Sequence, residues 1–297
     1  MSYLKLYQEG KLQEISRILS ENMKNCTLCP QNCLVDRVGD NVGFCGADSK
    51  LRVSHLFLHQ REEPEIVGKK GSGTIFFSYC NLGCVYCQNY NISNIGDGHD
   101  ITVEVLAHNM IDLQEQGAEN INLVTPTHYT AQIIEALVIA VKEGLNIPLV
   151  YNCGGYESLE IIKLLAGVFD IYMPDIKYSD DAVAQELSHV SDYWKIVRES
   201  TLEMYRQVGN LMVKDGLANR GLLIRHLVLP NKLAGSFKVL DFIKNEISPD
   251  CYVNIMNQYY PCHKAFSNEK ISRNITINEY NEVIDYAKSI GLHRGFA

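Results

Sequence analysis

Three cysteines, Cys80, Cys84 and Cys87, stand close together with the spacing C-x3-C-x2-C. They directly follow a short apolar run over residues 74–78, so their thiol groups fall on one loop beyond a predicted strand. Three thiolates suit an iron–sulfur cluster with one open iron, whereas tetrahedral zinc more often uses paired C-x2-C spacings. The alternatives are three buried cysteines that cluster by chance, or a zinc site that takes another ligand from elsewhere. The spacing favours a cluster whose open iron binds a further molecule.

Four more cysteines lie near the start of the chain and are separated by two, three and eleven residues: Cys26, Cys29, Cys33 and Cys45. The stretch that holds them has no clear periodicity, and its glycines allow tight turns. Four thiolates make a closed site, which is either structural zinc or an auxiliary iron–sulfur cluster. Both fit cysteine-only ligation, so we predict a metal site here and leave the metal open.

The elements that must position these cysteines are short apolar runs that alternate with helical patterns from Gly73 onward. The six runs predict buried parallel strands over residues 74–78, 120–124, 148–151, 171–173, 222–229 and 252–256. The helical patterns predict helices over residues 103–115, 131–143, 158–165, 193–208, 237–245 and 278–289. This alternation implies βαβ units in a doubly wound sheet or an incomplete (β/α) barrel. In both folds, sites lie at the carboxyl ends of the strands.

The composition predicts one large α/β domain, because 46% of the 297 residues are hydrophobic and 21% are charged. We expect an N-terminal helix within residues 1–25, a Cys-rich metal-binding extension over 26–70 and the main domain over 71–297. The net charge of -8 gives no support for binding to nucleic acid or to an anionic membrane. No signal peptide or long apolar stretch is visible, so we expect a cytoplasmic protein whose ten cysteines serve metal or redox chemistry.

The loop of Cys80, Cys84 and Cys87, with the aromatic Tyr86 before its third cysteine, resembles the signature of the radical S-adenosylmethionine (SAM) superfamily. The resemblance selects the partial (β/α)6 barrel, which is similar to an open TIM barrel, and it places Tyr86 beside the cofactors. It implies that SAM chelates the fourth iron of a [4Fe-4S] cluster. One electron from the cluster then cleaves SAM to methionine and a 5′-deoxyadenosyl radical, which abstracts hydrogen from the substrate.

The resemblance extends over most of the chain to the activating enzymes of glycyl radical enzymes such as pyruvate formate-lyase, and especially to their uncharacterised PflX-type relatives. Its landmarks are residues 26–30, 152–156, 172–178, 224–230 and 254–259. The activating enzymes hold SAM partly through a D-x-K motif after the fourth strand and through a nearby monovalent cation. Asp175-Ile-Lys177 matches this motif, so the resemblance makes Asp175 the candidate ligand of SAM or of the cation. An ordinary surface ion pair is the alternative.

Two further strand-end residues are candidates by the same resemblance. Asn152 lies where activating enzymes often carry an acidic residue, so a cation site here would have one formal charge fewer. Arg225, at the end of the fifth strand, is a candidate for a bidentate clamp on the SAM carboxylate. The alternative is that Arg225 and His226 only close the barrel edge.

One segment departs from the family pattern. A Gly-Gly-Glu type motif usually follows the second strand and binds the SAM amino group, but this chain has Thr125-Pro-Thr127-His128. The hydroxyls of Thr125 and Thr127 can accept hydrogen bonds from an ammonium group, so we expect both to contact the cofactor. His128 is either an acid, base or substrate contact, or a histidine that only fills hydrogen bonds.

Three functions fit these observations. The first is a glycyl radical enzyme activase that acts on a partner protein, and the second is a radical SAM enzyme that acts on a small molecule or another peptide. The third is a non-catalytic iron–sulfur or zinc protein, against which the six strands and the Asp175-Ile-Lys177 match argue. For the first two, a flavodoxin or ferredoxin is the implied electron donor.

Overall fold

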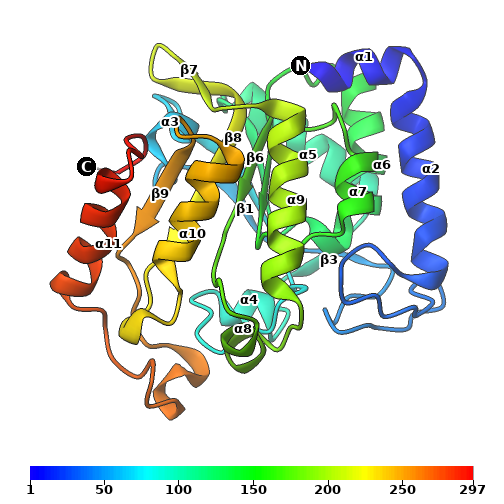
Figure 1. Cartoon of the computed structure of the whole chain (residues 1–297). Coiled ribbons are helices and arrows are strands. Elements are labelled where there is room, and N and C mark those ends of the chain that lie inside the picture. Colours follow the sequence, from blue (N-terminus) through cyan, green and yellow to red (C-terminus); the bar gives the residue numbers. More distant parts are fainter. Residues whose placement is uncertain (297) are drawn as a thin grey trace.

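A computed structural model of the chain describes residues 1–296 and contains a nine-stranded sheet with the order β3-β1-β2-β4-β5-β6-β8-β7, in which β9 pairs with β8. Six of the strands run parallel to one another: β2 (Ser72–Phe77), β4 (Ile121–Val124), β5 (Leu149–Cys153), β6 (Ile171–Pro174), β8 (Leu217–Leu227) and β9 (Tyr252–Met256). These are the six predicted strands. The inner strands β5 and β6 are buried along their whole length, as strands of a covered parallel sheet are (Figure 1).

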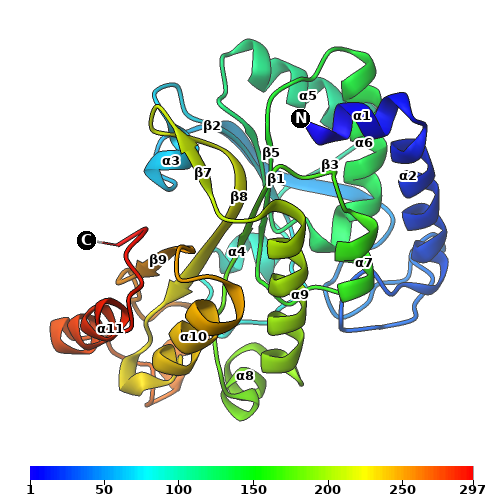
Figure 2. The same cartoon turned by 45° about the horizontal axis from the view of Figure 1, so that its top comes forward.

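The helices that follow these strands confirm the predicted alternation. They are α5 (Val103–Glu115), α6 (Thr130–Lys142), α7 (Leu159–Leu164), α9 (Tyr193–Val208), α10 (Ser236–Phe242) and α11 (Ile277–Ser289). A π-helical turn over Ile243–Ile247 continues α10. In Figure 2 the N-terminal helices lie beside α6 at one side of the sheet, and α10 and α11 lie at the opposite side.

The sheet does not close into a barrel. Its first parallel strand, β2, pairs on its outer edge with antiparallel β1 (Leu51–His59), which in turn pairs with β3 (His99–Ile101). At the other end, β8 forms an antiparallel hairpin with β7 (Met212–Lys214) and pairs with β9. The predicted partial (β/α)6 barrel is therefore confirmed, with antiparallel strands that the sequence patterns did not reveal.

The N-terminal segment forms two helices where the periodicity predicted one: α1 (Ser2–Gln8) and α2 (Lys11–Asn22). Gly10 separates them, because its backbone takes the left-handed conformation with φ of 73°. Both helices join the core, since Tyr3, Leu12 and Leu19 are fully buried. The sheet also crosses the boundary expected between residues 70 and 71, because β1 pairs with β2.

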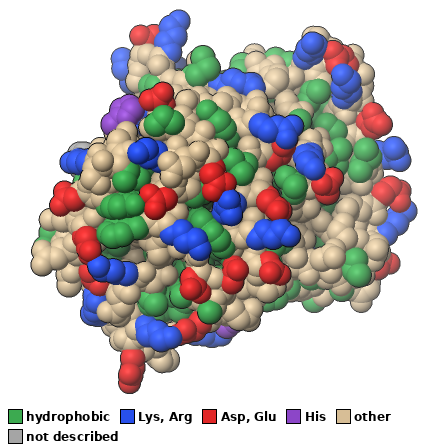
Figure 3. Space-filling view, viewed as in Figure 1, with side chains coloured by type: hydrophobic (Ala, Val, Ile, Leu, Met, Phe, Trp, Pro, Cys, Tyr) green, Lys and Arg blue, Asp and Glu red, His purple; other side chains and the backbone are tan. Residues whose placement is uncertain are grey.

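Short elements complete the description. They are the helices α3 (Pro64–Val67), α4 (Tyr90–Ser93) and α8 (Asp181–Ser188), and the 3-10 turns Met23–Asn25, Thr127–Tyr129, Pro230–Lys232 and His263–Ser267. No helix within residues 1–296 is long and apolar enough to cross a membrane. On the face drawn in Figure 3, basic and acidic side chains are interspersed.

Candidate active site

The carboxyl ends of the parallel strands open onto a cavity of about 290 Å³. A volume near 300 Å³ is at the lower end of the range for small-molecule sites. Cys80, Cys84 and Cys87 all line this cavity, because the loop that carries them leaves β2 at the same edge of the sheet. All three are free cysteines. The residues that the spacing singled out are therefore brought to one cavity.

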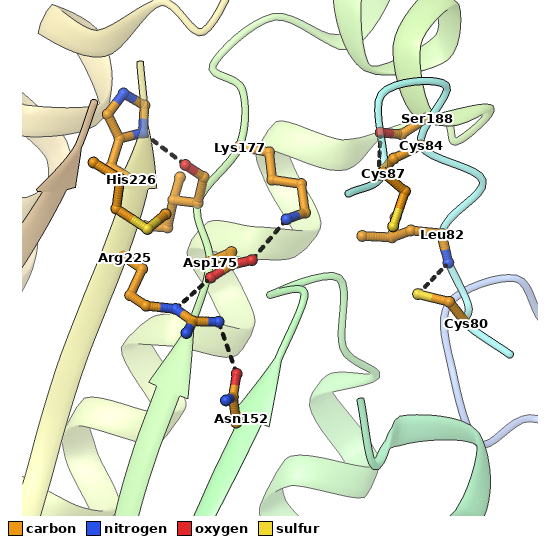
Figure 4. A network of polar contacts seen from close by, with 12 residues as sticks. Cys80, Leu82, Cys84, Cys87, Asn152, Asp175, Lys177, Ser188, Arg225 and His226 are labelled. Carbon is orange, nitrogen blue, oxygen red and sulfur yellow. Dashed lines mark hydrogen bonds and ion pairs between the residues drawn. The ribbon is translucent and has the colours of Figure 1, made fainter. Parts of the chain in front are cut away.

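Each of the three sulfur atoms is contacted by a hydrogen-bond donor of the chain. The backbone N–H of Leu82 donates to Cys80 Sγ at 3.4 Å, and the hydroxyl of Ser93 donates to Cys87 Sγ at 3.1 Å. Cys84 Sγ lies 2.9 Å from Ser188 Oγ, as Figure 4 shows. Donors aimed at sulfur stabilise a thiolate, which is the form that binds iron. The three side chains thus fit cluster ligation.

The hydroxyl of Ser188 belongs to a buried chain that reaches Tyr86. Ser188 Oγ lies 2.8 Å from the Tyr178 hydroxyl oxygen, which lies 2.6 Å from that of Tyr86. Because an iron-bound Cys84 thiolate has no proton to give, Ser188 must then donate to the sulfur. Tyr86 lines the cavity, and its ring packs edge-on against Tyr178 and Tyr259.

A network of charged side chains lines the cavity opposite the cysteine loop (Figure 4). Asp175 follows β6, and its two carboxylate oxygens accept from Arg225 Nε at 2.8 Å and from Lys177 Nζ at 2.7 Å. Arg225, on β8, also donates to Asn152 Oδ1 at 2.8 Å and to Glu62 Oε2 at 3.2 Å. Three parallel strands thus bring four of the predicted site residues into one network.

The electrostatics of the network follow from this pairing. Burial by itself would raise the pKa of Asp175, but Arg225 and Lys177 lower that pKa to about 2. Burial raises the pKa of Glu62 to about 7, although Arg225 opposes this shift. The network therefore carries two fixed positive charges, one fixed negative charge and one carboxyl group that titrates near neutral pH. Both oxygens of Asp175 already face cationic side chains, which disfavours the monovalent cation expected there.

The segment after β4 contributes one of its two predicted contacts. Thr125 lines the cavity, and its backbone takes φ of 59°, which is rare and strained for a β-branched residue. Thr127, by contrast, does not line the cavity: it is fully buried and its hydroxyl donates to Glu157 Oε1 at 2.8 Å. Its position therefore does not support a contact with SAM. His128 is also buried, and its Nε2 lies 2.8 Å from the carbonyl oxygen of Ser78.

Sequence reasoning missed three residues of this site. Glu62 reaches the cavity from the loop after β1, and that strand was itself not predicted. Ser188 lies at the end of α8 and Ser93 at the end of α4, and both helices are too short to leave a periodic signal. No spacing links these residues to the cysteines, so only tertiary packing reveals them.

The other four cysteines gather elsewhere. Cys26, Cys29, Cys33 and Cys45 line a second, smaller cavity formed by the irregular segment after α2. None of these four lines the larger cavity. The two cysteine groups thus line two different cavities.

Comparisons with known proteins place this site in a family. Residues 74–243 match the model of the Radical SAM superfamily. The uncharacterized protein MJ0674 of Methanocaldococcus jannaschii is 32% identical over 296 residues, which cover 96% of this chain and 81% of that protein. Pyruvate formate-lyase 1-activating enzyme of Escherichia coli is 27% identical over 161 residues, or 52% of this chain and 60% of the enzyme.

A solved structure has the same fold. The Streptococcus suis protein SuiB, bound to S-adenosylmethionine, superposes with a TM-score of 0.50 at 15% identity. The match covers 73% of this chain and 47% of SuiB, so the chain spans about half the length of that protein. The matched family model covers more than half of the sequence and includes all three cysteines of the loop after β2. The chain is an enzyme that belongs to the radical SAM superfamily.

Proposed function

We propose that Cys80, Cys84 and Cys87 bind the [4Fe-4S] cluster of this enzyme and that SAM binds in the cavity between them and Asp175, Lys177 and Arg225. One observation carries the proposal: the three thiols and the charged network line the same cavity at the carboxyl ends of the parallel strands. When bound, the cluster supplies one electron to SAM, whose cleavage to methionine gives a 5′-deoxyadenosyl radical that abstracts hydrogen from the substrate.

The charged network suits the methionyl end of SAM, which carries a carboxylate and an ammonium group. Lys177 and Arg225 keep N–H donors beyond those that contact Asp175, Asn152 and Glu62, so they can also donate to a carboxylate. With Glu62 protonated, the network has a net charge of one positive unit, which favours an anionic group. We assign Lys177 and Arg225 to this carboxylate, and Asp175 and Asn152 to the orientation of their side chains.

The rest of the cavity wall orients SAM and excludes water. Thr125 is strained at the end of β4, and such strain persists where the surrounding structure holds a backbone segment in place for function. We therefore assign the backbone of Thr125 to the SAM amino group, in place of the glycine-rich motif of the family. Phe76, Leu227 and Met256 supply apolar surface, which keeps water away from a reactive radical.

We further propose that the radical is passed to a glycyl radical enzyme. The similarity to an activating enzyme over 161 residues supports this substrate class. A flavodoxin or ferredoxin would then supply the electron to the cluster. A small molecule or another peptide in place of the glycyl radical enzyme would use the same cavity chemistry up to hydrogen abstraction.

The test is anaerobic reconstitution with iron and sulfide, followed by SAM, a strong reductant and measurement of 5′-deoxyadenosine. We expect formation by the wild type and none by Cys84→Ala. Cys251→Ala is the matched control, because Cys251 is fully buried immediately before β9 and does not line the cavity. Absence of 5′-deoxyadenosine from a wild-type protein with a loaded cluster would refute the proposed chemistry.

The substrate proposal needs a separate measurement. Pyruvate formate-lyase, a glycyl radical enzyme, is mixed with the reduced enzyme and SAM, and the sample is examined by electron paramagnetic resonance. We expect the doublet of a glycyl radical on the partner. Formation of 5′-deoxyadenosine without this radical would exclude that partner and favour a small molecule or another peptide.

A further inference from the structure

The N-terminal cysteines share one enclosed cavity although their segment has no helix or strand. Residues 26–50 are irregular throughout, and they nevertheless bring four sulfur-bearing side chains to the same cavity wall. None of the four cysteines forms a disulfide. The approach is close, because a Cβ atom at Gly43 would lie 2.8 Å from Cys33 Sγ and would displace that side chain. A loop without helix or strand needs another constraint, such as a bound metal centre, to hold these side chains together.

A backbone N–H group points at one of these sulfur atoms, as it does in the loop after β2. Phe44 N–H donates to Cys33 Sγ at 3.3 Å. Leu82 N–H donates to Cys80 Sγ at 3.4 Å in the same way. The two cysteine groups thus share a hydrogen bond from the backbone to a sulfur atom, a contact that also tunes cluster-bound sulfurs.

A second observation, independent of the cysteines, indicates that the cavity takes an anionic group. Arg37 lines it, is only 1% exposed, and within residues 1–296 has no carboxylate at ion-pair distance. Its guanidinium donates only to the carbonyl oxygens of Asp48 and His128, at 2.6 to 3.1 Å. A buried cation without an opposite charge is costly. Four thiolates around a metal centre carry the missing negative charge.

A third observation concerns His128, which lines the same cavity and is 1% exposed. Its Nε2 contacts a backbone carbonyl, so this nitrogen carries the proton, while its buried Nδ1 has no hydrogen-bond partner in the part of the chain that the structure describes. An unpaired buried nitrogen at a cavity wall indicates a group that the protein itself does not supply.

The arrangement of the thiols favours a cluster over zinc. Tetrahedral zinc holds four sulfurs at about 2.3 Å from one point. The cysteines here stand around a cavity of about 10 Å³, so their sulfur atoms do not meet at one point. Nor do any three histidine, cysteine, aspartate or glutamate side chains of residues 1–296 converge on a point suited to one metal ion.

An iron–sulfur cluster does not require that convergence. Each cysteine binds a different iron atom or shares one with a single neighbour, so the sulfur atoms stand apart around the cluster. The same lack of convergence applies to Cys80, Cys84 and Cys87, which belong to the family's cluster loop. The N-terminal cysteines therefore stand around their cavity without meeting at one point, as the cysteines of the family's cluster loop do, and this likeness favours a cluster.

We propose that Cys26, Cys29, Cys33 and Cys45 bind a second iron–sulfur cluster, with Arg37 as its buried counter-charge. All four ligand positions come from the protein, so this cluster has no open iron for SAM. Its loop contacts the SAM-cluster loop, because the Gln31 side chain donates to the carbonyl oxygen of Asn81 at 3.0 Å, beside Cys80. The two cysteine loops are thus in direct contact.

The test measures iron, sulfide and zinc per chain after anaerobic purification and reconstitution, in four forms of the protein. They are the wild type, Cys26→Ser/Cys33→Ser, the triple variant Cys80→Ala/Cys84→Ala/Cys87→Ala, and the matched control Cys251→Ala. Mössbauer spectra identify the cluster type, and circular dichroism reports whether each variant is folded. These readouts do not depend on SAM cleavage, so failure of the proposed function would leave this test intact.

The expected result is about eight irons and eight sulfides in the wild type and control, and about four in each of the two multiple variants. About six irons and six sulfides in the wild type would identify a two-iron second cluster and would also support the proposal. The proposal would be overturned if the wild type contained four irons and one zinc and the zinc were absent from Cys26→Ser/Cys33→Ser. A folded triple variant that contains no iron would overturn it as well.

Discussion

Replacing Ser188 with alanine is expected to lower the reduction potential of a cluster bound through Cys84. Ser188 is fully buried at the end of α8, and its hydroxyl lies 2.9 Å from Cys84 Sγ. A hydrogen bond to a ligating sulfur stabilises the added electron, so its loss favours the oxidised state. The substitution removes one oxygen atom and leaves the Tyr178–Tyr86 contact in place.

The magnitude follows from the strength of one hydrogen bond. A net contribution of about 0.5 to 1.5 kcal/mol applies to a typical bond. If that full amount is present only in the reduced state, it corresponds to about 20 to 65 mV for one electron. The expected shift is therefore a decrease within this range. Ser93→Ala should give a smaller shift, because the single proton of Ser93 is shared between Cys87 Sγ and Asn94 Oδ1.

The assay is an anaerobic redox titration followed by electron paramagnetic resonance. The signal that changes when SAM is added belongs to the SAM-binding cluster, which separates it from any second centre. Ser289→Ala is the matched control, because Ser289 is exposed at the end of α11 and only contacts a backbone carbonyl of its own helix. A Ser188→Ala protein with full iron content and the wild-type potential would refute the reasoning.

Three further predictions concern stability, measured as the free energy of unfolding in urea. Asp175→Asn should cost about 2 kcal/mol at pH 7, because Arg225 and Lys177 lower the Asp175 pKa from 3.8 to about 2 and lose this partner. The stabilisation by ionised Asp175 is present above about pH 4 and is lost as the pH falls through 2. The control is Asp285→Asn, because Asp285 is exposed and its replacement should change the free energy of unfolding by less than about 0.5 kcal/mol. Burial raises the pKa of Glu157 from 4.5 to about 7. The free energy of unfolding therefore falls by up to about 3 kcal/mol as the pH rises from 4.5 through 7. Glu157→Gln should then be more stable than the wild type at pH 8 but not at pH 4.5. Thr125→Gly should raise stability by about 1 kcal/mol, because glycine relieves the left-handed strain.

Each of these stability predictions has a result that contradicts it. Equal unfolding free energies of Asp175→Asn and Asp285→Asn would mean that the buried network does not stabilise the fold. An advantage of Glu157→Gln that is the same at pH 4.5 and pH 8 would exclude proton linkage as its cause. A destabilised Thr125→Gly would mean that contacts of the threonine side chain outweigh the backbone strain.

The sequence by itself determined the parallel sheet and both cysteine groups. Buried parallel strands are recognisable because both their faces are apolar, and helices α5 and α9 have the predicted bounds because their periodicity is uninterrupted. The antiparallel strands β1 and β3 escaped prediction, since an edge strand is partly exposed and its partner is chosen by packing. Gly10 divided a helix that the apolar pattern alone would continue.

The tertiary structure decided which partners the polar side chains at the strand ends contact. Asp175, Lys177 and Arg225 were identified from a motif and from strand ends, but only packing shows that they pair with one another and with Glu62. Thr127 follows a strand end as Thr125 does, yet the turn after β4 directs it toward Glu157 and away from the cavity. Local sequence fixes which residues reach the edge of the sheet, whereas side-chain direction depends on backbone turns and neighbours that are distant in the chain.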